Sequence, residues 1–337
     1  MKALLWTAPE RIEWTDVPMP APADGELLIK VHTVGVCGSD LEGYLGHNSL
    51  RKPPLLMGHE FSGTVEQVGS GGGFAPGQRV VVNPLSSCGR CRLCAQGLRQ
   101  LCDRRCLIGI HRAGAYAEYV VVPSDNAVAL PDGLPFETAA LTEPLACSFR
   151  AARRAMAGHA LADVAVVGAG AIGLLAAYSA RIMGASAIYV IDVNEARLRT
   201  AERLGIGVPI DARGDVEREV KRLRGESGVD VVIDAAGFQP TRTLAASLVR
   251  TGGVIMNVGL GIDDTSVPIN RFIRSEVDVK GSFCYADSDF QDALRLLADS
   301  KVSERGWTEL RPLSAGADAF RELVSGRCPS GKILLQS

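Results

Sequence analysis

The chain has 337 residues, a formal net charge of −2 and a hydrophobic fraction of 47 %. Its length suggests two domains with a large buried core. The small net charge gives no electrostatic footprint for nucleic acid or an anionic membrane. The longest apolar stretches are broken by glycines and are too short to span a bilayer.

Short runs rich in valine and isoleucine, separated by proline and glycine clusters, predict that the first ~145 residues are β-rich. The predicted strands are Leu27–Val31, Gly63–Val68, Arg79–Val82 and Tyr116–Val122. The glycine-rich stretch 69–73 lies between two of them, which favours a wide hairpin loop over a flexible linker.

Four cysteines, Cys88, Cys91, Cys94 and Cys102, follow in the spacing C-x2-C-x2-C-x7-C. A short loop that carries four thiolates can form a tetrahedral cage for Zn²⁺. Disulfides are the alternative, and the absence of a secretory apolar segment at Met1–Leu5 disfavours them, because reduced thiols are expected inside the cell. Four sulfur ligands leave no coordination position for a substrate. We therefore expect a structural zinc and a cytoplasmic protein.

From residue 163 to residue 281, apolar strands alternate with amphipathic helices, as in a parallel sheet covered on both faces. The predicted strands are Val164–Val167, Ile188–Asp192, Val229–Asp234, Val254–Val258 and Val277–Lys280. The predicted helices lie near Ile172–Met183, Glu195–Leu204, Val216–Arg224 and Pro240–Val249. The fold class is therefore α/β with a β-rich N-terminal part.

The segment Gly168-Ala169-Gly170-Ala171-Ile172-Gly173 is a complete G-x-G-x-x-G motif between the first of these strands and its helix. Its glycines permit a tight turn and let a pyrophosphate approach backbone N–H groups at a helix N-terminus. Asp192 ends the next strand, where a carboxylate accepts hydrogen bonds from a ribose and repels a 2′-phosphate. Asp192 can instead be a turn former, and Arg197 can stack on adenine, admit NADP or be solvated. We expect NAD.

A second group of metal-binding residue types lies in the N-terminal region. Cys37-Gly38-Ser39-Asp40, Gly58-His59-Glu60 and Glu143 supply a thiolate, an imidazole and carboxylates. No local spacing brings these segments together, so a buried cysteine, a core histidine and surface carboxylates remain the alternative.

Taken together, these motifs resemble the zinc-containing medium-chain dehydrogenase/reductase family over essentially the whole chain. The matching segments are Gly35–Asp40, Gly58–Glu60, the four-cysteine loop, Glu143–Ala146, Gly168–Gly173 and Ser330–Leu335. The resemblance implies a GroES-like catalytic domain over residues 1–147 and 288–337. It also implies a doubly wound Rossmann domain over residues 148–287 that binds NAD.

The resemblance further implies residue roles. Cys37, His59 and one or both of Glu60 and Glu143 would hold a catalytic zinc. Ser39 would pass the substrate's hydroxyl proton outward, and Asp40 would orient the site from behind the ligands, so that the catalytic set is Ser39, Asp40, Glu60 and Glu143. The expected cofactor contacts are Gly168, Gly170, Ile172, Gly173, Asp192, Arg197, Val258, Gly259, Leu260, Ser282 and Phe283. A homo-oligomer, either a dimer or a tetramer, is expected.

Three positions bear on the substrate. Glu143 stands where classical alcohol dehydrogenases carry a second cysteine, which resembles the polyol and threonine dehydrogenase branches. Glu42 stands where threonine and alcohol dehydrogenases often carry a relay histidine, which disfavours a threonine dehydrogenase. Cys284 stands where sorbitol dehydrogenases carry an arginine, which disfavours sorbitol itself as the substrate. We expect oxidation of a secondary hydroxyl of a polyol, cyclitol or sugar derivative to a ketone. The alternatives are an L-threonine 3-dehydrogenase, a zinc-free quinone reductase and a non-catalytic nucleotide sensor.

The polar loop after residue 46 is expected to be solvated, with a place at the substrate entrance as the alternative. Its polar residues are His47, Asn48, Ser49, Arg51 and Lys52. The two basic residues leave a phosphorylated polyol open as a substrate. Tyr44 either lines the pocket or packs in the core or at the surface.

Overall fold

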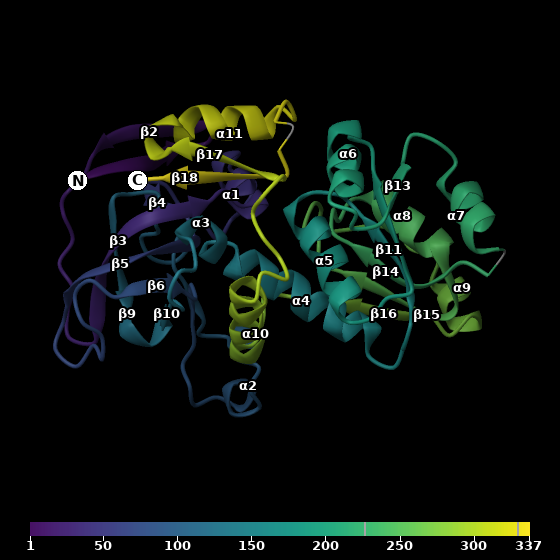
Figure 1. Ribbon diagram of the computed structural model, residues 1–337, viewed down its shortest axis with the longest axis horizontal. Coiled ribbons are helices and arrows are strands. Elements are labelled where there is room, and N and C mark those ends of the chain that lie inside the picture. The colour runs from purple at the N-terminus through teal and green to yellow at the C-terminus, as the bar shows by residue number, and fades with distance from the viewer. Residues whose placement is uncertain (226, 329) are drawn as a thin grey trace. The chain divides into compact units, whose positions relative to one another are not determined.

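The computed structural model describes residues 1–225, 227–328 and 330–337 and divides the chain into two units (Figure 1). The first unit comprises Met1–Glu143 and Ala286–Ser337, and the second comprises Pro144–Tyr285. The boundaries fall slightly before those expected at 147/148 and 287/288. Helix α4 (Thr142–Met156) spans the first of these expected boundaries, and its first two residues belong to the first unit.

The first unit is built mainly of antiparallel strands. Seven strands form its main sheet, in the order β10-β6-β5-β3-β18-β17 with β9 paired to β3, and two smaller sheets have the orders β2-β1-β4 and β7-β8. The strands are β1 (Lys2–Ala8), β2 (Arg11–Asp16), β3 (Glu26–Gly35), β4 (Leu55–Leu56), β5 (Glu60–Val68), β6 (Arg79–Val82), β7 (Leu85–Ser86), β8 (Cys106–Leu107), β9 (Tyr119–Pro123), β10 (Ala127–Ala129), β17 (Thr308–Pro312) and β18 (Lys332–Gln336).

Short helices connect these strands. They are α1 (Gly38–Tyr44), α2 (Arg92–Ala95), α3 (Phe136–Ala139), α10 (Asp287–Ala298) and α11 (Gly316–Val324), with 3₁₀ turns at Arg99–Leu101, Ser124–Asn126 and Leu313–Ala315. The core contains large, fully buried side chains such as Trp6, Phe61 and Phe320. Burial of this apolar surface holds the three sheets together.

Strand pairing in the main sheet positions the segments that matter for function. Gly35 at the end of β3 pairs with Glu60 at the start of β5 on one side and with Leu334 of β18 on the other. Cys37 follows β3 directly, and His59 precedes β5 directly. Segments far apart in the sequence therefore meet where β3 ends and β5 begins.

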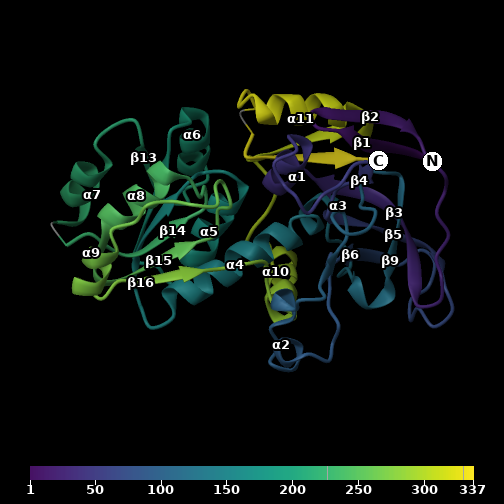
Figure 2. The ribbon, with the colours of Figure 1, turned by 180° about the vertical axis from the view of Figure 1, so that it is seen from behind.

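The second unit is a six-stranded parallel sheet in the order β13-β12-β11-β14-β15-β16. Its strands are β11 (Asp163–Val167), β12 (Ala187–Asp192), β13 (Val208–Asp211), β14 (Val229–Asp234), β15 (Val249–Asn257) and β16 (Asp278–Gly281). Besides α4, its helices are α5 (Ala171–Ile182), α6 (Glu195–Arg203), α7 (Val216–Arg224), α8 (Gln239–Leu248) and α9 (Ile269–Arg274). Within this unit α5 lies on one face of the sheet and α8 on the opposite face (Figures 1 and 2).

Most of the predicted strands and helices are present, and the differences have physical causes. Tyr116 lies outside β9, because its backbone amide donates to Met57 and its backbone oxygen accepts from Leu4 instead of pairing with β3. Strand β13 was not predicted, since Pro209 lies in it; β13 is an edge strand, where proline is tolerated. The stretch 69–73 joins the antiparallel strands β5 and β6, as the hairpin prediction requires. Among the described residues, no helix has the length and apolar character needed to cross a membrane.

Candidate metal centre and nucleotide site

The first candidate site lies where β3, α1 and β5 meet. The turn before β5 needs a glycine, because Gly58 has a φ of 95° and a Cβ there would lie 2.9 Å from the backbone nitrogen of Tyr116. The residue that follows this turn, His59, is buried, with 5 % of its surface exposed. The ligand atoms of Cys37, His59 and Glu60 lie within 4.8 Å of one another.

Asp40 fixes the histidine of this group. Its Oδ1 lies 3.3 Å from His59 Nδ1, which leaves the other ring nitrogen, Nε2, to act as a ligand. Asp40 Oδ2 accepts hydrogen bonds from the Tyr116 hydroxyl at 2.6 Å and from the backbone amide of Cys37 at 3.4 Å. Burial alone would raise the pKa of Asp40, but the charge and hydrogen bond of His59 and the charge of Arg51 lower it. Asp40 is therefore a buried carboxylate that orients the imidazole.

The charges of two neighbours also act on His59. Burial lowers the pKa of His59, but the negative charges of Asp40 and Cys37 outweigh burial and raise that pKa well above its usual value. The negative charges around the imidazole therefore favour a cation at this site. A divalent metal ion on Nε2 would satisfy the same charges.

The carboxylate of Glu60 is held by a lysine from the last strand. Lys332 at the start of β18 forms an ion pair with Glu60 Oε2, and the two side chains are 3 % and 1 % exposed. Burial alone would lower the pKa of Lys332, but the charges of Glu60 and Cys37 raise it above its usual value. Glu143 is buried and its charge also acts on Lys332, but it is outside the group of three ligand atoms.

These residues fit a catalytic zinc. Glu60 Oε1 is buried and has no hydrogen-bond partner among the described residues. A thiolate, an imidazole and a carboxylate are donors that zinc takes in catalytic sites, where three protein ligands leave a fourth position open. Of the two carboxylates that the sequence left open, the geometry favours Glu60 as the third ligand.

Ser39 and Arg51 lie beside this group. The Ser39 hydroxyl lies 3.5 Å from Cys37 Sγ and accepts a hydrogen bond from Arg51 Nη2 at 3.2 Å. The expectation that Arg51 belongs to a solvated loop is wrong, because Arg51 turns inward to pair with Asp40, whereas Lys52 is exposed. A buried arginine that is already paired is not available to bind a substrate phosphate.

Tyr44 packs in the core rather than lining a pocket. Its ring lies 5.4 Å from that of Phe320, and its hydroxyl donates to the backbone oxygen of Glu10 at 2.7 Å. In the polar loop, His47 pairs with Glu42 at 3.1 Å, and both side chains are largely exposed.

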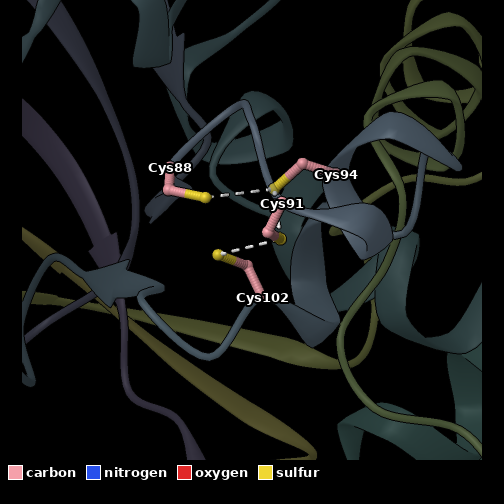
Figure 3. A group of neighbouring side chains, drawn as sticks. All are labelled: Cys88, Cys91, Cys94 and Cys102. Atoms are coloured by element: carbon pink, nitrogen blue, oxygen red, sulfur yellow. Dashed lines mark hydrogen bonds between the residues drawn. The ribbon is translucent and has the colours of Figure 1, made fainter.

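The four cysteines of the C-x2-C-x2-C-x7-C loop converge (Figure 3). Their Sγ atoms lie 3.9 Å apart for Cys88 and Cys94, 3.4 Å for Cys91 and Cys94, and 3.9 Å for Cys91 and Cys102. Zinc–sulfur bonds of about 2.3 Å place the sulfur atoms of a tetrahedral site about 3.8 Å apart. The spacing therefore fits zinc, whereas a disulfide needs a bond of about 2.05 Å.

The loop around these sulfur atoms favours thiolates. A hydrogen bond from the Arg90 backbone, outweighing a small burial effect, lowers the pKa of Cys88 to about 5. A hydrogen bond from the Ser87 side chain lowers the pKa of Cys94. These donors stabilise the thiolates of Cys88 and Cys94. The Cys94 backbone amide lowers the pKa of Cys91, but the side-chain contact with Cys94 and burial outweigh it and raise that pKa to about 11, so Cys91 loses its proton only when a metal binds.

The second unit contains a cavity of about 890 Å³ at the carboxyl ends of its strands. Its lining includes Gly168, Gly170, Asp192, Arg197 and Phe238. At this crevice of an open parallel sheet, dinucleotides bind with their pyrophosphate at a helix N-terminus.

Two glycines of the G-x-G-x-x-G motif are each required by the local backbone geometry, for different reasons. Gly168 turns with a φ of 100°. A Cβ on Gly173 would collide with the backbone oxygen of Gly168, so only glycine lets helix α5 pack this close to the loop. Gly173 and Ile172 are not among the residues lining the cavity and instead support its shape.

Asp192 is anchored by the chain itself. Its Oδ2 accepts a hydrogen bond from the Ala169 amide at 2.6 Å, and its Oδ1 accepts one from the Asn194 amide at 2.7 Å. Arg197 Nη1 lies 3.9 Å from Asp192 Oδ2. The carboxylate is thus fixed between the glycine loop and α6, with its charge only partly offset by Arg197.

The other five expected cofactor contacts follow the neighbouring strands β15 and β16. They are Val258, Gly259, Leu260, Ser282 and Phe283, and none of them lines the cavity. The amides of Val258 and Gly259 donate to the backbone oxygen of Asp234, and Leu260 is 76 % exposed. Their role in binding a cofactor stays a prediction.

Comparison with known proteins identifies the family. Residues 23–132 match the model of the alcohol dehydrogenase GroES-like domain, and residues 171–299 match that of the zinc-binding dehydrogenase. Over 97 % of its length the chain is 33 % identical to the L-galactonate-5-dehydrogenase of Escherichia coli (strain K12), of which 96 % is covered. The chain belongs to the zinc-binding alcohol dehydrogenase family. The resemblance inferred from the motifs and the predicted fold class are confirmed.

Two further similarities refine the comparison. The dehydrogenase is 35 % identical over 92 % of its length to the sorbitol dehydrogenase of Halalkalibacterium halodurans, of which 91 % is covered. It also matches the crystal structure of a zinc-binding dehydrogenase from Sinorhizobium meliloti 1021 bound to NADP, with a TM-score of 0.89, 31 % identity and coverage of 100 % and 99 % of the two chains.

Three residues of the dehydrogenase's metal site were not predicted to act there. Arg51, Tyr116 and Lys332 each contact Asp40 or Glu60 from a distant segment. The one local signal is the position of Lys332 at the start of a strand that is otherwise buried and apolar, where an unpaired charge is unfavourable.

Proposed function

We propose that this dehydrogenase oxidises a secondary hydroxyl of a polyol, cyclitol or sugar derivative to a ketone, reversibly, with NAD as the hydride acceptor. The observation that carries the proposal is the group of Cys37, His59 and Glu60 ligand atoms within 4.8 Å of one another, backed by the buried carboxylate of Asp40. When bound, zinc supplies a Lewis acid that lowers the pKa of a hydroxyl group, and NAD supplies the hydride acceptor.

The chain's own residues prepare this reaction. Cys37, His59 and Glu60 would hold the metal, and Asp40 keeps His59 Nδ1 engaged so that Nε2 faces the metal. Ser39 Oγ lies next to Cys37 Sγ, where it can accept a hydrogen bond from the substrate hydroxyl and carry its proton away from the metal.

The charges around the site support a neutral substrate. Thiolate and carboxylate ligands already offset the charge of a divalent metal. The nearby cations, Arg51 and Lys332, are buried and paired with Asp40 and Glu60. The names of the relatives, an L-galactonate dehydrogenase and a sorbitol dehydrogenase, both refer to polyhydroxylated compounds. Sorbitol is neutral whereas galactonate carries a carboxylate, so these names support the polyhydroxylated class and not its charge.

NAD is proposed over NADP on the strength of Asp192. This carboxylate lines the cavity, where its negative charge would repel the 2′-phosphate of NADP. Each ~1.4 kcal/mol of such repulsion lowers the affinity for NADP by about tenfold. Arg197 acts in the opposite direction, and the similar dehydrogenase from Sinorhizobium meliloti 1021 is bound to NADP.

A substrate screen that follows NADH absorbance tests the proposal. Polyols, cyclitols, sugar phosphates, threonine and ethanol are compared by kcat/KM, with zinc per chain measured by atomic emission. We expect a neutral polyol or cyclitol to exceed ethanol by about 100-fold, equivalent to ~2.7 kcal/mol of added hydrogen bonding, and two zinc ions per chain. Threonine as the best substrate, or parity of ethanol with the polyols, would refute the substrate class. One zinc per chain without turnover would indicate a sensor, and none a zinc-free reductase.

We also propose that the dehydrogenase is a cytoplasmic homo-oligomer. None of the nine cysteines forms a disulfide, and a set of zinc-binding cysteines suits a reducing compartment. The edge strand β16 and helix α9 carry exposed apolar side chains, including Val279 at 52 % and Ile273 at 68 %, as expected of a surface that a second copy covers. Light scattering of the purified protein tests this, and a monomer would refute it.

A further inference from the structure

Arg51 is a buried cation that the proposed chemistry does not itself require. Its side chain, like that of Asp40, is 0 % exposed. A single nitrogen, Nη2, donates to Asp40 Oδ1 at 2.9 Å and to Ser39 Oγ at 3.2 Å. Its Nε and Nη1 are buried without a hydrogen-bond partner among the described residues. Burying a guanidinium group that lacks hydrogen-bond partners for two of its nitrogens costs free energy, so packing alone does not explain why an arginine is present here.

The helix beside Arg51 leaves room for it. Gly43 lies within α1, and a Cβ at this position would lie 2.5 Å from Arg51 Cδ and 3.3 Å from Met57 Sδ. Glycine inside a helix is less favourable than alanine by about 1 kcal/mol. Helix α1 thus contains a residue that weakens it and that gives the arginine its space.

The two groups that Arg51 contacts each adjoin a metal ligand. Asp40 Oδ1 is also 3.3 Å from His59 Nδ1, and Ser39 Oγ is 3.5 Å from Cys37 Sγ. A serine oxygen has two acceptor sites and one proton. With Arg51 filling one acceptor site, the orientation of the Ser39 hydroxyl is restricted and one acceptor site remains for a substrate hydroxyl.

We propose that Arg51 is a positioning residue for the hydroxyl oxidation, acting by fixing the Ser39 hydroxyl and the Asp40 carboxylate in one geometry. The inference rests on the proposed function. Arg51 itself touches neither substrate nor metal ligand and transfers no proton. Its effect reaches the reaction through Ser39, and reaches the metal through Asp40 and His59.

A double-mutant cycle tests the connection to Ser39. The variants Arg51→Met, Ser39→Ala and the double variant are compared in kcat and KM with the best substrate of the screen. We expect Arg51→Met to lower kcat by about 10–100-fold, as removal of a group behind the ligands does, with KM changed less than ~3-fold. The double variant should be no slower than the slower single variant, because both changes disable the same hydroxyl. Effects that multiply in the double variant, or an unchanged kcat in Arg51→Met, would overturn the proposal.

Zinc release gives a second readout that needs no turnover. Protein and a chromogenic zinc chelator are mixed, and the release of the ion not held by the four-cysteine loop is timed. We expect release from Arg51→Met about 10-fold faster than from the unmodified protein, since Asp40 is then held less firmly against His59. If the screen finds no substrate, the proposed function fails, while this rate still tests Arg51. An unchanged rate would remove its link to the metal.

Two further variants and a control test the position of Arg51. Gly43→Ala should lower kcat as Arg51→Met does, because its Cβ displaces Arg51, and Tm should fall as well because the buried Arg51–Asp40 pair is disturbed. Arg51→Lys should fall between the unmodified enzyme and Arg51→Met, and it carries the test if Arg51→Met does not fold. The matched control is Arg112→Met, which removes another arginine–carboxylate pair of the same unit, 2.9 Å from Glu26. A kcat loss in this control equal to that of Arg51→Met would show a general folding effect and overturn the assignment.

Discussion

Lys332 offers the sharpest test of how the metal site is assembled. Its ion pair with Glu60 is almost fully buried, at 3 % and 1 % exposure. Removing one partner of such a pair costs about 3–5 kcal/mol, because an uncompensated charge is left inside the protein. Methionine preserves most of the length and packing of the lysine chain. We therefore expect Lys332→Met to lower the free energy of unfolding by about 3 kcal/mol.

The assay is thermal and urea unfolding of the purified variants. A loss of about 3 kcal/mol corresponds to a Tm lower by roughly 6–12 °C for a unit of the size of Met1–Glu143 and Ala286–Ser337, which contains the pair. Adding Glu60→Gln to Lys332→Met should restore part of the loss, since a buried pair removed as a whole is often nearly neutral. The control is Lys30→Met, an exposed lysine on β3, expected to change stability by no more than ~0.5 kcal/mol. Equal effects of the two lysine variants would refute the buried pair.

Three further outcomes are expected. Cys94→Ser should remove the structural zinc and lower Tm, whereas Cys37→Ser should leave the fold nearly intact and abolish turnover; calorimetry and zinc content check both. NAD should exceed NADP by at least ~10-fold in kcat/KM, and Asp192→Ala should reduce that preference. Burial, then the charges of Lys30 and Arg79, lower the pKa of His32. Stability should therefore fall as pH drops below about 6.5, and His32→Gln should reduce that fall in a Tm series from pH 7 to 5.

Each of these expectations has a contradicting result. Equal thermal destabilisation by the two cysteine variants would show that the zinc sites do not have separate roles. Equal use of NADP by the unmodified enzyme would mean that Arg197 outweighs Asp192. A steeper acid loss in His32→Gln than in the unmodified protein would mean that the neutral imidazole is not the form stabilised by folding.

The parts of the molecule predictable from the sequence are those encoded locally. Four cysteines within one loop and three glycines within one turn leave little choice of partner, and both motifs lie where the spacing predicts. The alternation of strands and helices in the second unit is equally local, and the bounds of β14 and α7 match the predicted ranges residue for residue. Where a proline interrupts the pattern, at β13, the local signal fails.

The metal site depends on contacts between distant segments, and the sequence alone does not predict these contacts. Tyr116 reaches Asp40 across 76 positions, and Lys332 comes from the last strand to meet Glu60. Hydrophobic periodicity places such residues on a strand or in a loop, but it does not say which carboxylate they meet. The predicted roles of Asp40 and Glu60 came from resemblance, and their partners came only from the fold.

Arg51 shows why composition misleads about this site. In sequence, an arginine and a lysine next to a polar loop look like an accessible basic patch that suits a phosphorylated substrate. In the fold, the two cations next to the metal ligands, Arg51 and Lys332, are each buried against a carboxylate, with 0 % and 3 % of the side chain exposed. A cation that is already neutralised and shielded from solvent adds little attraction for a phosphate. Arg51, which looks accessible in sequence, therefore adds little preference for phosphorylated substrates, and the choice among hydroxyl compounds falls to hydrogen bonding at Ser39 and the metal.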